Sequence, residues 1–521
     1  MNRWVILSLA LLGFSAAWLT ARFQTAPGYM DAEYYFVGGL QLVDGKGFSE
    51  EILWNYLDDP KGIPHPSHGY WMPLTSLAAA LGMAFSGSHS FVGGQWIFLA
   101  VAACIPPLTA HLSFLLTRRQ NLALLSGLLA VFPGFYLVYL PTSDSFGLCM
   151  LLGGLFLASV GSAHKLAPLA MGFLAGLLHL SRADGVLWLL VAFIFVALQR
   201  RQPSKRSARL GWLYSAGVCL AGYLIVMAPW MLRNLLVFGS PLSAGGSRSL
   251  WITQYNEMFI YPASLLTAER WLQSGLGAIL SARGWALGLN LQTALAVQAE
   301  IFLAPLILVG LWRLRYEQGV QAGFLAWGLT LAVMTIVFPY QGGRGGFFHS
   351  GAAIQPLFWA VAPLGLDAFI EWGGRKRGWN VRQAGRVFSV ALTLIAIVLT
   401  VTLTFRRLAG GEFSERAWNA NQQRYTQVEL ELARRGVDPQ AVIMVNNAPG
   451  YYAAARRPAV SIPYGNLQTL LEVAKRYRAQ ILLVEVEQVQ GEQLLERPGN
   501  RPGLEYWGTT AEARIYAIQQ P

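Results

Sequence analysis

The segment from residue 29 to residue 74, YMDAEYYFVGGLQLVDGKGFSEEILWNYLDDPKGIPHPSHGYWMPL, separates two long apolar parts of the chain. It begins shortly after the first apolar stretch, where a helix that crosses a bilayer would emerge into water. Ionisable side chains gather in it, and those that we consider for chemistry are Asp31, Glu33, Asp58, Asp59, Lys61, His65 and His68. Because ionisable groups beside hydrocarbon are costly and usually functional, this segment indicates polar chemistry at a membrane surface.

The composition excludes an ordinary soluble protein. Of the 521 residues, 54% are hydrophobic and only 13% are charged, which is too few polar residues to cover a soluble globule of this size. The three cysteines, Cys104, Cys149 and Cys219, all lie in apolar stretches, so neither a disulfide framework nor a thiolate metal site is indicated. We therefore expect a multi-pass protein of the cell membrane.

About eleven apolar stretches approach the ~20 residues that a membrane-spanning helix needs. They are residues 4–21, 92–116, 122–140, 146–160, 166–180, 185–198, 210–232, 301–312, 322–339, 352–370 and 387–405. Residues 4–21 lack a small-x-small cleavage site before Arg22, so we expect an uncleaved first helix. Residues 71–85 are a twelfth candidate, which hydropathy alone does not decide.

Short basic segments predict the orientation, because such segments remain cytoplasmic. They are residues 118–119, 164–165, 200–209, 313–315 and 375–386. All of them share the side of the N-terminus only if residues 71–85 do not cross, so we expect that segment to be a helix along the outer interface. The N-terminus is then cytoplasmic and the C-terminal region is outside. The net charge of +12 is explained by these loops. We do not expect nucleic-acid binding, because it needs a continuous basic face.

The composition changes near Gly410, where charged residues reach the density of a soluble domain. Alternation and apolar runs predict strands at residues 441–446, 459–462 and 480–486, an amphipathic helix at 467–478 and a helical connector at 419–435. We therefore predict a transmembrane domain at residues 1–409, with large outer loops at 23–90 and 234–300. A small extramembrane α/β domain at residues 410–521 follows it.

Asp31 is the first candidate for catalysis. A carboxylate that follows a transmembrane helix can take a proton from an attacking hydroxyl when partial burial raises its basicity. Glu33 is the second candidate, and the simpler alternative is that Asp31 caps the next helix.

The segment from Asp58 to His68 supports two further hypotheses. Lys61, His65 and His68 can hold a phosphate group or another part of a donor. Asp58 and Asp59 with the two histidines can instead bind a divalent cation, an alternative that we do not favour. A solvated loop made rigid by its prolines is the plain reading.

Other polar residues interrupt apolar sequence and fall on the predicted outer side, and they are Asp144, Arg182, Asp184, Arg233, Arg344 and His349. Asp184 can neutralise Arg182 in a tight turn, or the guanidinium can hold a phosphate group in two-point contact. The chain has no G-x-G-x-x-G, Walker, H-E-x-x-H or G-x-S-x-G motif, so the nucleotide chemistry of soluble enzymes is not supported.

Several short motifs occur in a fixed order along the chain. They are D-A-E-Y-Y from Asp31, G-x-G-F from Gly45, HPSHGYWMPL from His65, Ser143-Asp144, R-A-D-G from Arg182 and P-W-M-L-R-N from Pro229. In this order the chain resembles, over nearly its whole length, the GT-C superfamily of membrane glycosyltransferases, which includes protein mannosyltransferases and the lipid A aminoarabinose transferase. It departs from the family where His65–His68 replaces a K-P-P-L lysine and where Asp31-Ala-Glu33 replaces a D-E pair.

The resemblance implies an all-α, GT-C-like membrane fold with a small C-terminal α/β domain. It implies transfer of a sugar from a polyprenyl-phosphate-linked donor to an envelope lipid, glycan or protein at the outer face, without a cofactor. It implies Asp31 as general base, with Glu33 as the other catalytic candidate, and Arg182, Arg233 or Arg344 as phosphate ligands. The remaining candidate donor contacts are Lys61, His65, His68, Asp144 and His349. A transporter or lipid flippase and a non-catalytic envelope scaffold remain alternatives, although no internal repeat favours a transporter.

Overall fold

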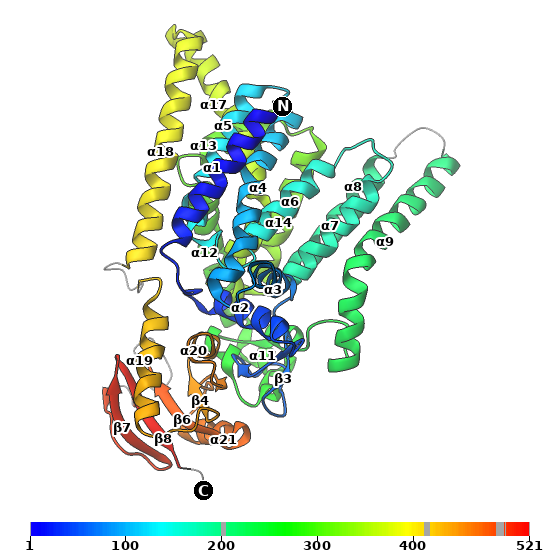
Figure 1. Ribbon diagram of the computed structural model, residues 1–521. Coiled ribbons are helices and arrows are strands. Elements are labelled where there is room, and N and C mark those ends of the chain that lie inside the picture. The colour runs from blue at the N-terminus through cyan, green and yellow to red at the C-terminus, as the bar shows by residue number, and fades with distance from the viewer. Residues whose placement is uncertain (1, 200–204, 411–416, 486–493, 495, 520–521) are drawn as a thin grey trace. The chain divides into compact units, whose positions relative to one another are not determined.

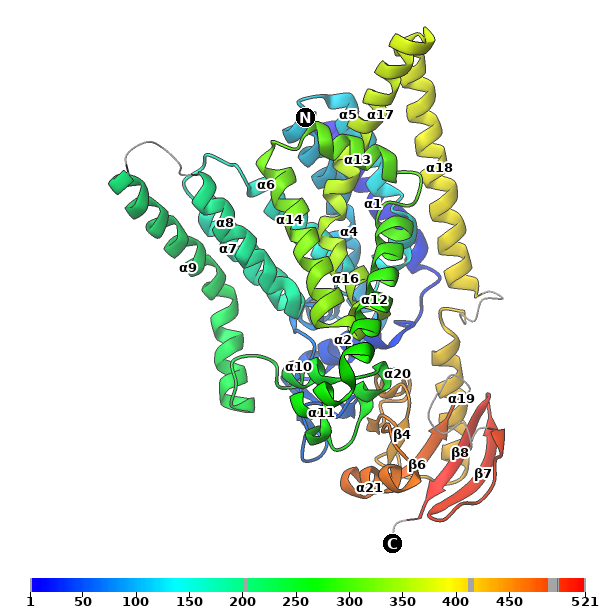
Figure 2. The ribbon, with the colours of Figure 1, turned by 180° about the vertical axis from the view of Figure 1, so that it is seen from behind.

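The computed structural model describes residues 2–199, 205–410, 417–485, 494 and 496–519. Two compact units are present (Figures 1 and 2). Unit 1 consists of Met1–Phe23, Gln95–Arg233 and Ala282–Arg407, and unit 2 consists of Gln24–Gly94, Asn234–Ser281 and Leu408–Pro521. The structure therefore divides the chain differently from the predicted single boundary near Gly410, because segments from three parts of the sequence pack together in unit 2.

Unit 1 is built from helices. Its main helices are α1 (Arg3–Ala21), α4 (Phe91–Thr117), α5 (Gln120–Val131), α6 (Phe146–Ser159), α7 (Ala167–Ser181), α8 (Val186–Gln199), α9 (Lys205–Phe238), α12 (Gly275–Thr293), α13 (Ala304–Arg313), α14 (Gln318–Ala332), α15 (Pro339–Gln341), α16 (Phe347–Gly351), α17 (Gln355–Arg377) and α18 (Val381–Ala409). Short 3₁₀ or π segments join several of them, including η1 (Gly134–Tyr139), η2 (Ala183–Gly185), η6 (Ala294–Gln298), η7 (Val333–Val337), η8 (Gly342–Gly346) and η9 (Ala352–Ile354). Part of the predicted basic loop at 200–209 lies outside the described residues.

The chain is a multi-pass membrane protein, although the predicted number of eleven spans is not confirmed. Among the described residues, six helices are long and apolar enough to cross a bilayer. They are Arg3–Ala21, Phe91–Thr117, Gly211–Phe238, Gln318–Val337, Pro339–Arg377 and Val381–Ala409. Four other predicted spans, α6, α7, α8 and α13, are apolar helices of 10 to 15 residues, shorter than the ~20 residues of a typical span.

One sequence-based expectation within this unit is wrong, and another segment contains a helix that the sequence did not predict. Residues 122–140 do not form one helix, because α5 ends at Val131 and Pro133 removes a main-chain donor while disfavouring helical geometry at Phe132. Part of the predicted outer loop 234–300 is the 19-residue helix α12. Arg283 and Asn290 lower the hydropathy of α12, so a hydropathy scan does not detect it.

Close helix packing in unit 1 depends on small residues. A Cβ atom at Gly310 of α13 would collide with the carbonyl oxygen of Val361 in α17, and one at Gly365 of α17 would collide with the carbonyl oxygen of Leu306 in α13. Helices in lipid associate through such backbone approaches, because lipid chains are as apolar as leucine and give no hydrophobic driving force. The α17–α18 turn is a hairpin that closes at Gly378, which has a positive φ of 68°. Figures 1 and 2 show this hairpin at one end of the unit.

Unit 2 combines short helices with two sheets. Its helices are α2 (Met30–Val43), α3 (Leu74–Ser86), α10 (Ala244–Arg248), α11 (Ala268–Gln273), α19 (Ala420–Arg434), α20 (Ala448–Ala455) and α21 (Leu467–Tyr477), with 3₁₀ turns η3 (Ser249–Trp251), η4 (Tyr255–Phe259) and η5 (Ala263–Leu265). Its strands are β1 (Ser49–Glu50), β2 (Ile52–Leu53), β3 (His65–Pro66), β4 (Val442–Val445), β5 (Ala459–Val460), β6 (Ala479–Val484), β7 (Leu504–Thr510) and β8 (Ala513–Ile518). The predicted strands and helices between residues 419 and 486 are confirmed within a few residues.

The larger sheet has the order β2-β5-β4-β6-β8-β7. Strands β2, β5, β4 and β6 pair in parallel, whereas β8 pairs antiparallel with both β6 and β7. Strand residues alternate between two cores, as the period of two requires. Met444 and Leu482 face α21, whereas Ile443 and Ile481 face α19 and α20. The larger sheet therefore lies between two helical layers, with α21 on one face and α19 and α20 on the other (Figure 1). Strand β2 joins this sheet from more than 400 residues earlier in the chain, through the pairs Ile52–Ala459 and Leu53–Val460.

The segment 29–74 folds as a helix, a short β-pair and an aromatic cluster. Strand β1 pairs antiparallel with β3, and Trp54 stacks on Trp71 with ring centroids 4.1 Å apart. Helix α3 follows and packs against α2, where a Cβ atom at Gly39 would lie 2.9 Å from the Ala79 side chain. At 13 residues, α3 is shorter than a typical span, as α6, α7, α8 and α13 are, so the expectation that residues 71–85 do not cross stays a prediction.

Candidate functional site

Asp31 and Glu33 lie in the first turn of α2, in unit 2. No side chain of the N-cap residue Tyr29 bonds the helix end, so the partial positive charge of the first turn is available to stabilise carboxylates. Asp31 is partly exposed, whereas Glu33 is only 4% exposed. The two candidates for the catalytic base therefore have different environments although they are two residues apart.

Glu33 belongs to the interior of unit 2. The Asn447 amide donates a hydrogen bond of 2.6 Å to Glu33 Oε2, and Asn447 also caps α20 by accepting from the Gly450 N–H at 3.1 Å. Burial raises the pKa of Glu33 to about 7, and the Asn447 bond only partly opposes that shift. Glu33 thus joins α2 to the loop that starts α20, over 414 residues of sequence.

The loop from Asp58 to His68 does not assemble the predicted cation site. Within the described residues, Asp58, Asp59, His65 and His68 do not form a group whose ligand atoms all lie within 4.8 Å of one another. Both ring nitrogens of His65 face main-chain carbonyls, those of Ile52 at 2.9 Å and Pro66 at 3.0 Å. Asp59 pairs with Arg476 at 2.9 Å, so its carboxylate is also engaged.

His68 is buried and supports the fold of the same segment. Its ring nitrogens contact the hydroxyls of Ser67 at 2.7 Å and Ser76 at 3.0 Å, and its main-chain N–H donates to the Tyr34 hydroxyl at 2.9 Å. Lys61, in contrast, is exposed and lines a cavity of about 570 Å³ in unit 2, together with Arg476 and Arg478. Of the three predicted donor contacts of this loop, only Lys61 lines that cavity.

Unit 1 brings two of the predicted residues directly together. Asp144 lies just before α6, where its carboxylate accepts from the Ser145 hydroxyl at 3.1 Å and from the Ser145 N–H. His349 Nε2 lies 3.1 Å from Asp144 Oδ2, while His349 Nδ1 lies 2.9 Å from the Gly345 carbonyl oxygen. The imidazole stacks on Phe146 with centroids 4.2 Å apart. Carboxylate, carbonyl and aromatic ring together fix the orientation of this histidine.

Arg182 lies beside α16, the short helix that contains His349. Its Nε–H donates to the Ser350 hydroxyl at 3.0 Å and reaches Asp184 Oδ1 at 3.3 Å. The side chains of Arg182 and Asp184 are 16% and 12% exposed, so the pair is shielded from most solvent. Because Ser350 follows His349 directly, one short helix, α16, connects the Arg182 pair to the Asp144 pair. Ser350 was missed in the sequence, where only its place beside His349 could have drawn attention to it.

The two remaining arginines lie elsewhere in unit 1. Arg344 is exposed in the glycine-rich η8 segment, five residues before His349, and Gly345 beside it has a φ of +114° that only glycine adopts readily. Arg233 lies near the end of α9 with its guanidinium 4.8 Å from the centre of the Trp230 ring. We call Asp144, Arg182, Asp184, His349 and Ser350 the α16 cluster. It offers a fixed cation, an oriented imidazole and two carboxylates, which is a suitable set for binding an oxyanion and moving a proton.

Comparison with known proteins finds no matching family model and no matching curated sequence. Solved structures do match. The oligosaccharyltransferase AglB from Archaeoglobus fulgidus, in complex with an inhibitory peptide and a dolichol-phosphate, is 14% identical with a TM-score of 0.56, covering 99% of this chain and 74% of that one. ArnT from Cupriavidus metallidurans, bound to undecaprenyl phosphate, is 11% identical with a TM-score of 0.56, covering 99% of this chain and 98% of that one.

The chain has the GT-C fold. Both neighbours are members of the GT-C superfamily, so the fold expected from the order of the sequence motifs is confirmed. At 11 to 14% identity the similarity establishes the GT-C architecture and leaves the chemistry to be argued from the residues.

Proposed function

We propose that this GT-C protein is a membrane glycosyltransferase that moves a sugar from a polyprenyl-phosphate-linked donor to an envelope lipid, glycan or protein. The observation that carries the proposal is the α16 cluster, in which Ser350 and Asp184 orient the shielded guanidinium of Arg182. A fixed guanidinium matches the oxygens of a phosphate group in geometry and charge. The ArnT neighbour was solved with undecaprenyl phosphate, which is a lipid of the proposed class.

The reaction needs one bond to form and one to break. The acceptor oxygen bonds to the anomeric carbon of the sugar, the bond from that carbon to the phosphate oxygen breaks, and the acceptor proton passes to a base. The leaving polyprenyl phosphate gains negative charge as the sugar departs. Arg182 then stabilises the transition state more than the ground state, because its charge is already in position in a site with little water.

We assign the base to Asp31 rather than Glu33. Glu33 is buried, bonded to Asn447 and raised in pKa to about 7, which suits a structural role. Asp31 is partly exposed in the same helical turn. For donor contacts we retain Arg182, His349 and Arg344. His65 and His68 are assigned to shaping the segment 29–74, since their ring nitrogens already contact groups of unit 2.

The experiment uses the purified full-length protein in detergent. Native mass spectrometry measures binding of undecaprenyl phosphate, and turnover is followed as release of undecaprenyl phosphate from a panel of its sugar-linked forms, with an envelope lipid and protein extract as acceptor. We expect Asp31→Asn to bind undecaprenyl phosphate as the unmodified protein does and to lose about 10²–10⁴-fold in turnover.

Asp438→Asn, on an exposed loop of unit 2, is the matched control and should keep normal turnover. Full turnover by folded Asp31→Asn would remove it as the base. Movement of the lipid across vesicles without any sugar transfer would favour the transporter alternative, and binding without either activity would favour the scaffold.

We further propose that transfer takes place at the outer face, with the N-terminus in the cytoplasm. Single cysteines at Arg118 and Tyr464 test this placement with a reagent that does not cross membranes. Labelling of Tyr464→Cys from outside, and of Arg118→Cys only after permeabilisation, is the expected result. The reverse labelling pattern would contradict both the orientation and the proposed side of the reaction.

A further inference from the structure

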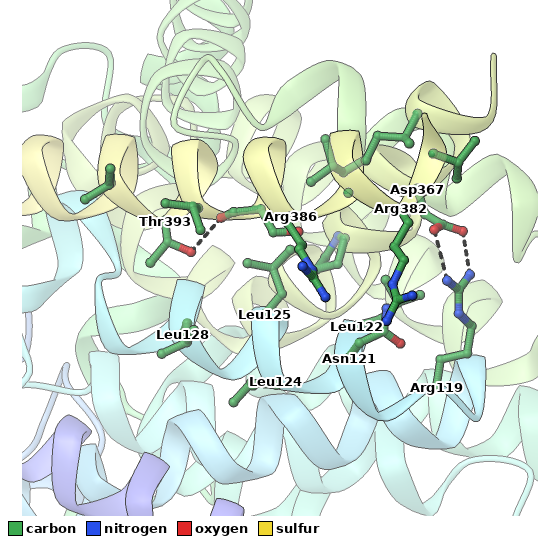
Figure 3. A pocket seen from close by; sticks show the side chains of 18 residues that line it. Arg119, Asn121, Leu122, Leu124, Leu125, Leu128, Asp367, Arg382, Arg386 and Thr393 are labelled. Carbon is green, nitrogen blue, oxygen red and sulfur yellow. Dashed lines mark hydrogen bonds and ion pairs between the residues drawn. The ribbon is translucent and has the colours of Figure 1, made fainter. Parts of the chain in front are cut away.

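A groove of about 810 Å³ lies in unit 1 among the start of α5, the middle of α17 and the first half of α18 (Figure 3). None of the residues that line it belongs to the α16 cluster. Helix α5 starts beside the groove at Gln120 and ends at Val131, from which η1 leads on to Asp144. The groove and the α16 cluster are therefore separate sites.

The mouth of the groove carries an excess of positive charge. Arg119 is engaged by Asp367, with one hydrogen bond of 2.9 Å from Arg119 Nη2 and a second from Arg119 Nη1. Asp367 is the one acidic residue in the lining, so this pair is neutral. Arg382 and Arg386 also line the groove, and among the described residues neither makes a hydrogen bond or an ion pair with protein. Two positive charges are therefore left without a partner among the residues that the structure describes.

These two arginines are placed to act together. They are four residues apart on α18, which puts them on the same face of the helix about one turn from each other. Figure 3 shows both side chains extending from α18 into the groove, toward α5. Two guanidinium groups at this spacing match the oxygens of one phosphodiester. The mouth of the groove is therefore complementary to a phosphate group.

The rest of the groove is apolar. Leu125 and Leu128 of α5 line it together with Val390 and Leu394 of α18. From Val381 to Leu394 the axis of α18 rises about 20 Å at 1.5 Å per residue, and half the hydrocarbon core of a bilayer is about 15 Å thick. The groove thus has a cationic head and an apolar length comparable to one lipid leaflet.

We propose that this groove binds an anionic glycerophospholipid, whose phosphate lies between Arg382 and Arg386 and whose acyl chain lies along Leu125, Leu128, Val390 and Leu394. A soluble anion would use the arginines and leave the apolar walls exposed, whereas a lipid fills both parts. Basic residues beside a membrane attract anionic lipid. The bound lipid holds α18 against α5 and α17, and so stabilises the hairpin of unit 1.

The test uses the full-length protein, delipidated in detergent and titrated with phosphatidylglycerol or phosphatidylcholine of identical acyl chains. Native mass spectrometry counts bound lipid, and thermal unfolding follows stabilisation. We expect phosphatidylglycerol to bind at least about tenfold more tightly than phosphatidylcholine. Arg382→Gln with Arg386→Gln should remove that preference, and the control Lys376→Gln, a basic residue of the same hairpin outside the groove lining, should keep it.

A second variant tests the apolar part of the site. Leu128→Trp fills the groove beside α18 and should weaken both lipids equally, which charge removal does not do. Unchanged preference for phosphatidylglycerol in the double arginine variant would overturn the proposal, and so would equal loss of preference in Lys376→Gln. If the double variant does not fold, the single variants Arg382→Gln and Arg386→Gln must each lower the preference. Binding of undecaprenyl phosphate at the α16 cluster is measured in the same samples, so failure here leaves the proposed function intact.

Discussion

Two buried carboxylates, Asp144 in unit 1 and Glu33 in unit 2, have different partners. Asp144 faces the imidazole of His349 at 3.1 Å and accepts from the hydroxyl and N–H of Ser145. Glu33 faces the neutral amide of Asn447 at 2.6 Å, and Glu485 and Asp31 add negative charge around it. A histidine can share a proton with its carboxylate, whereas an amide cannot.

The difference shows that residue type and burial alone do not assign a role. The Asp144 carboxylate orients the His349 imidazole, in a cluster that also holds a fixed arginine. The Glu33 carboxylate joins α2 to the Asn447 loop, and there its charge is an energetic cost that proximity to Asn447 reduces. We therefore expect the α16 cluster to take part in the reaction and Glu33 to stabilise unit 2. Three changes separate these roles.

The largest effect is expected for Arg182→Ala. Loss of the guanidinium removes charge stabilisation of the leaving phosphate, so turnover should fall about 10²–10³-fold, the cost typical of one preorganised donor, and undecaprenyl phosphate should bind more weakly. Arg182→Lys keeps the charge without the planar fork and should recover only part of the loss.

Turnover and lipid binding are measured together with Arg313→Ala as the control, because Arg313 is an exposed residue of unit 1 paired with Glu371 at 2.9 Å. Equal losses in Arg182→Ala and Arg313→Ala would mean that the effect is general and that the α16 cluster does not bind the donor.

The next effect concerns the cohesion of unit 2. Leu53 is 2% exposed in strand β2 and packs in the core with Met444 and Tyr477. Leu53→Ala should cost about 2–5 kcal/mol of local stability, through lost burial and the cavity that remains. Hydrogen exchange should accelerate in β5 and β4, which pair in series with β2.

Leu430→Ala is the matched control, since Leu430 is 57% exposed on α19. Exchange that accelerates only within residues 48–70 would show that β2 does not stabilise the larger sheet. The C-terminal module would then be independent, as the sequence-based boundary near Gly410 predicts.

The smallest effect is expected for Glu33→Gln, and it depends on pH. The pKa of Glu33 is raised from 4.5 to about 7, so its folded form prefers the proton. The raised pKa therefore makes a contribution to the free energy of unfolding that is fully present below pH 4.5 and is lost as the pH rises through about 7. This contribution is at most about 3 kcal/mol. Glutamine keeps an acceptor for Asn447 and carries no charge, so the variant should be more protected than the unmodified protein at pH 8.5 and equal to it at pH 4.5.

Exchange rates in α20 are compared between variant and unmodified protein at each pH, with Glu472→Gln as an exposed control on α21. A variant that is less protected at pH 8.5 would indicate that the Glu33 charge stabilises unit 2. In that case the contrast with Asp144 would disappear.

Local sequence pattern was sufficient for much of the fold. Helices such as α1, α4 and α18 and strands such as β4 and β6 were located from the chain itself, because hydropathy and alternation are properties of neighbouring residues. The break after Val131 was missed, although Pro133 and Gly134 in the sequence could have indicated it. The order of the motifs predicted the GT-C fold, and Asp144, Arg182 and His349 were chosen as polar residues out of place in apolar sequence.

Contacts between distant residues were decided only by the tertiary structure. Ile52 and Leu53 are too short a run to predict a strand, and they become one because β5 offers an open edge 407 residues later. The role of Glu33 depends on Asn447, the orientation of Arg182 on Ser350, and the lipid groove on α5 and α18 lying side by side. Sequence determines which groups are available through local patterns, while burial and pairing across hundreds of residues determine what each group does.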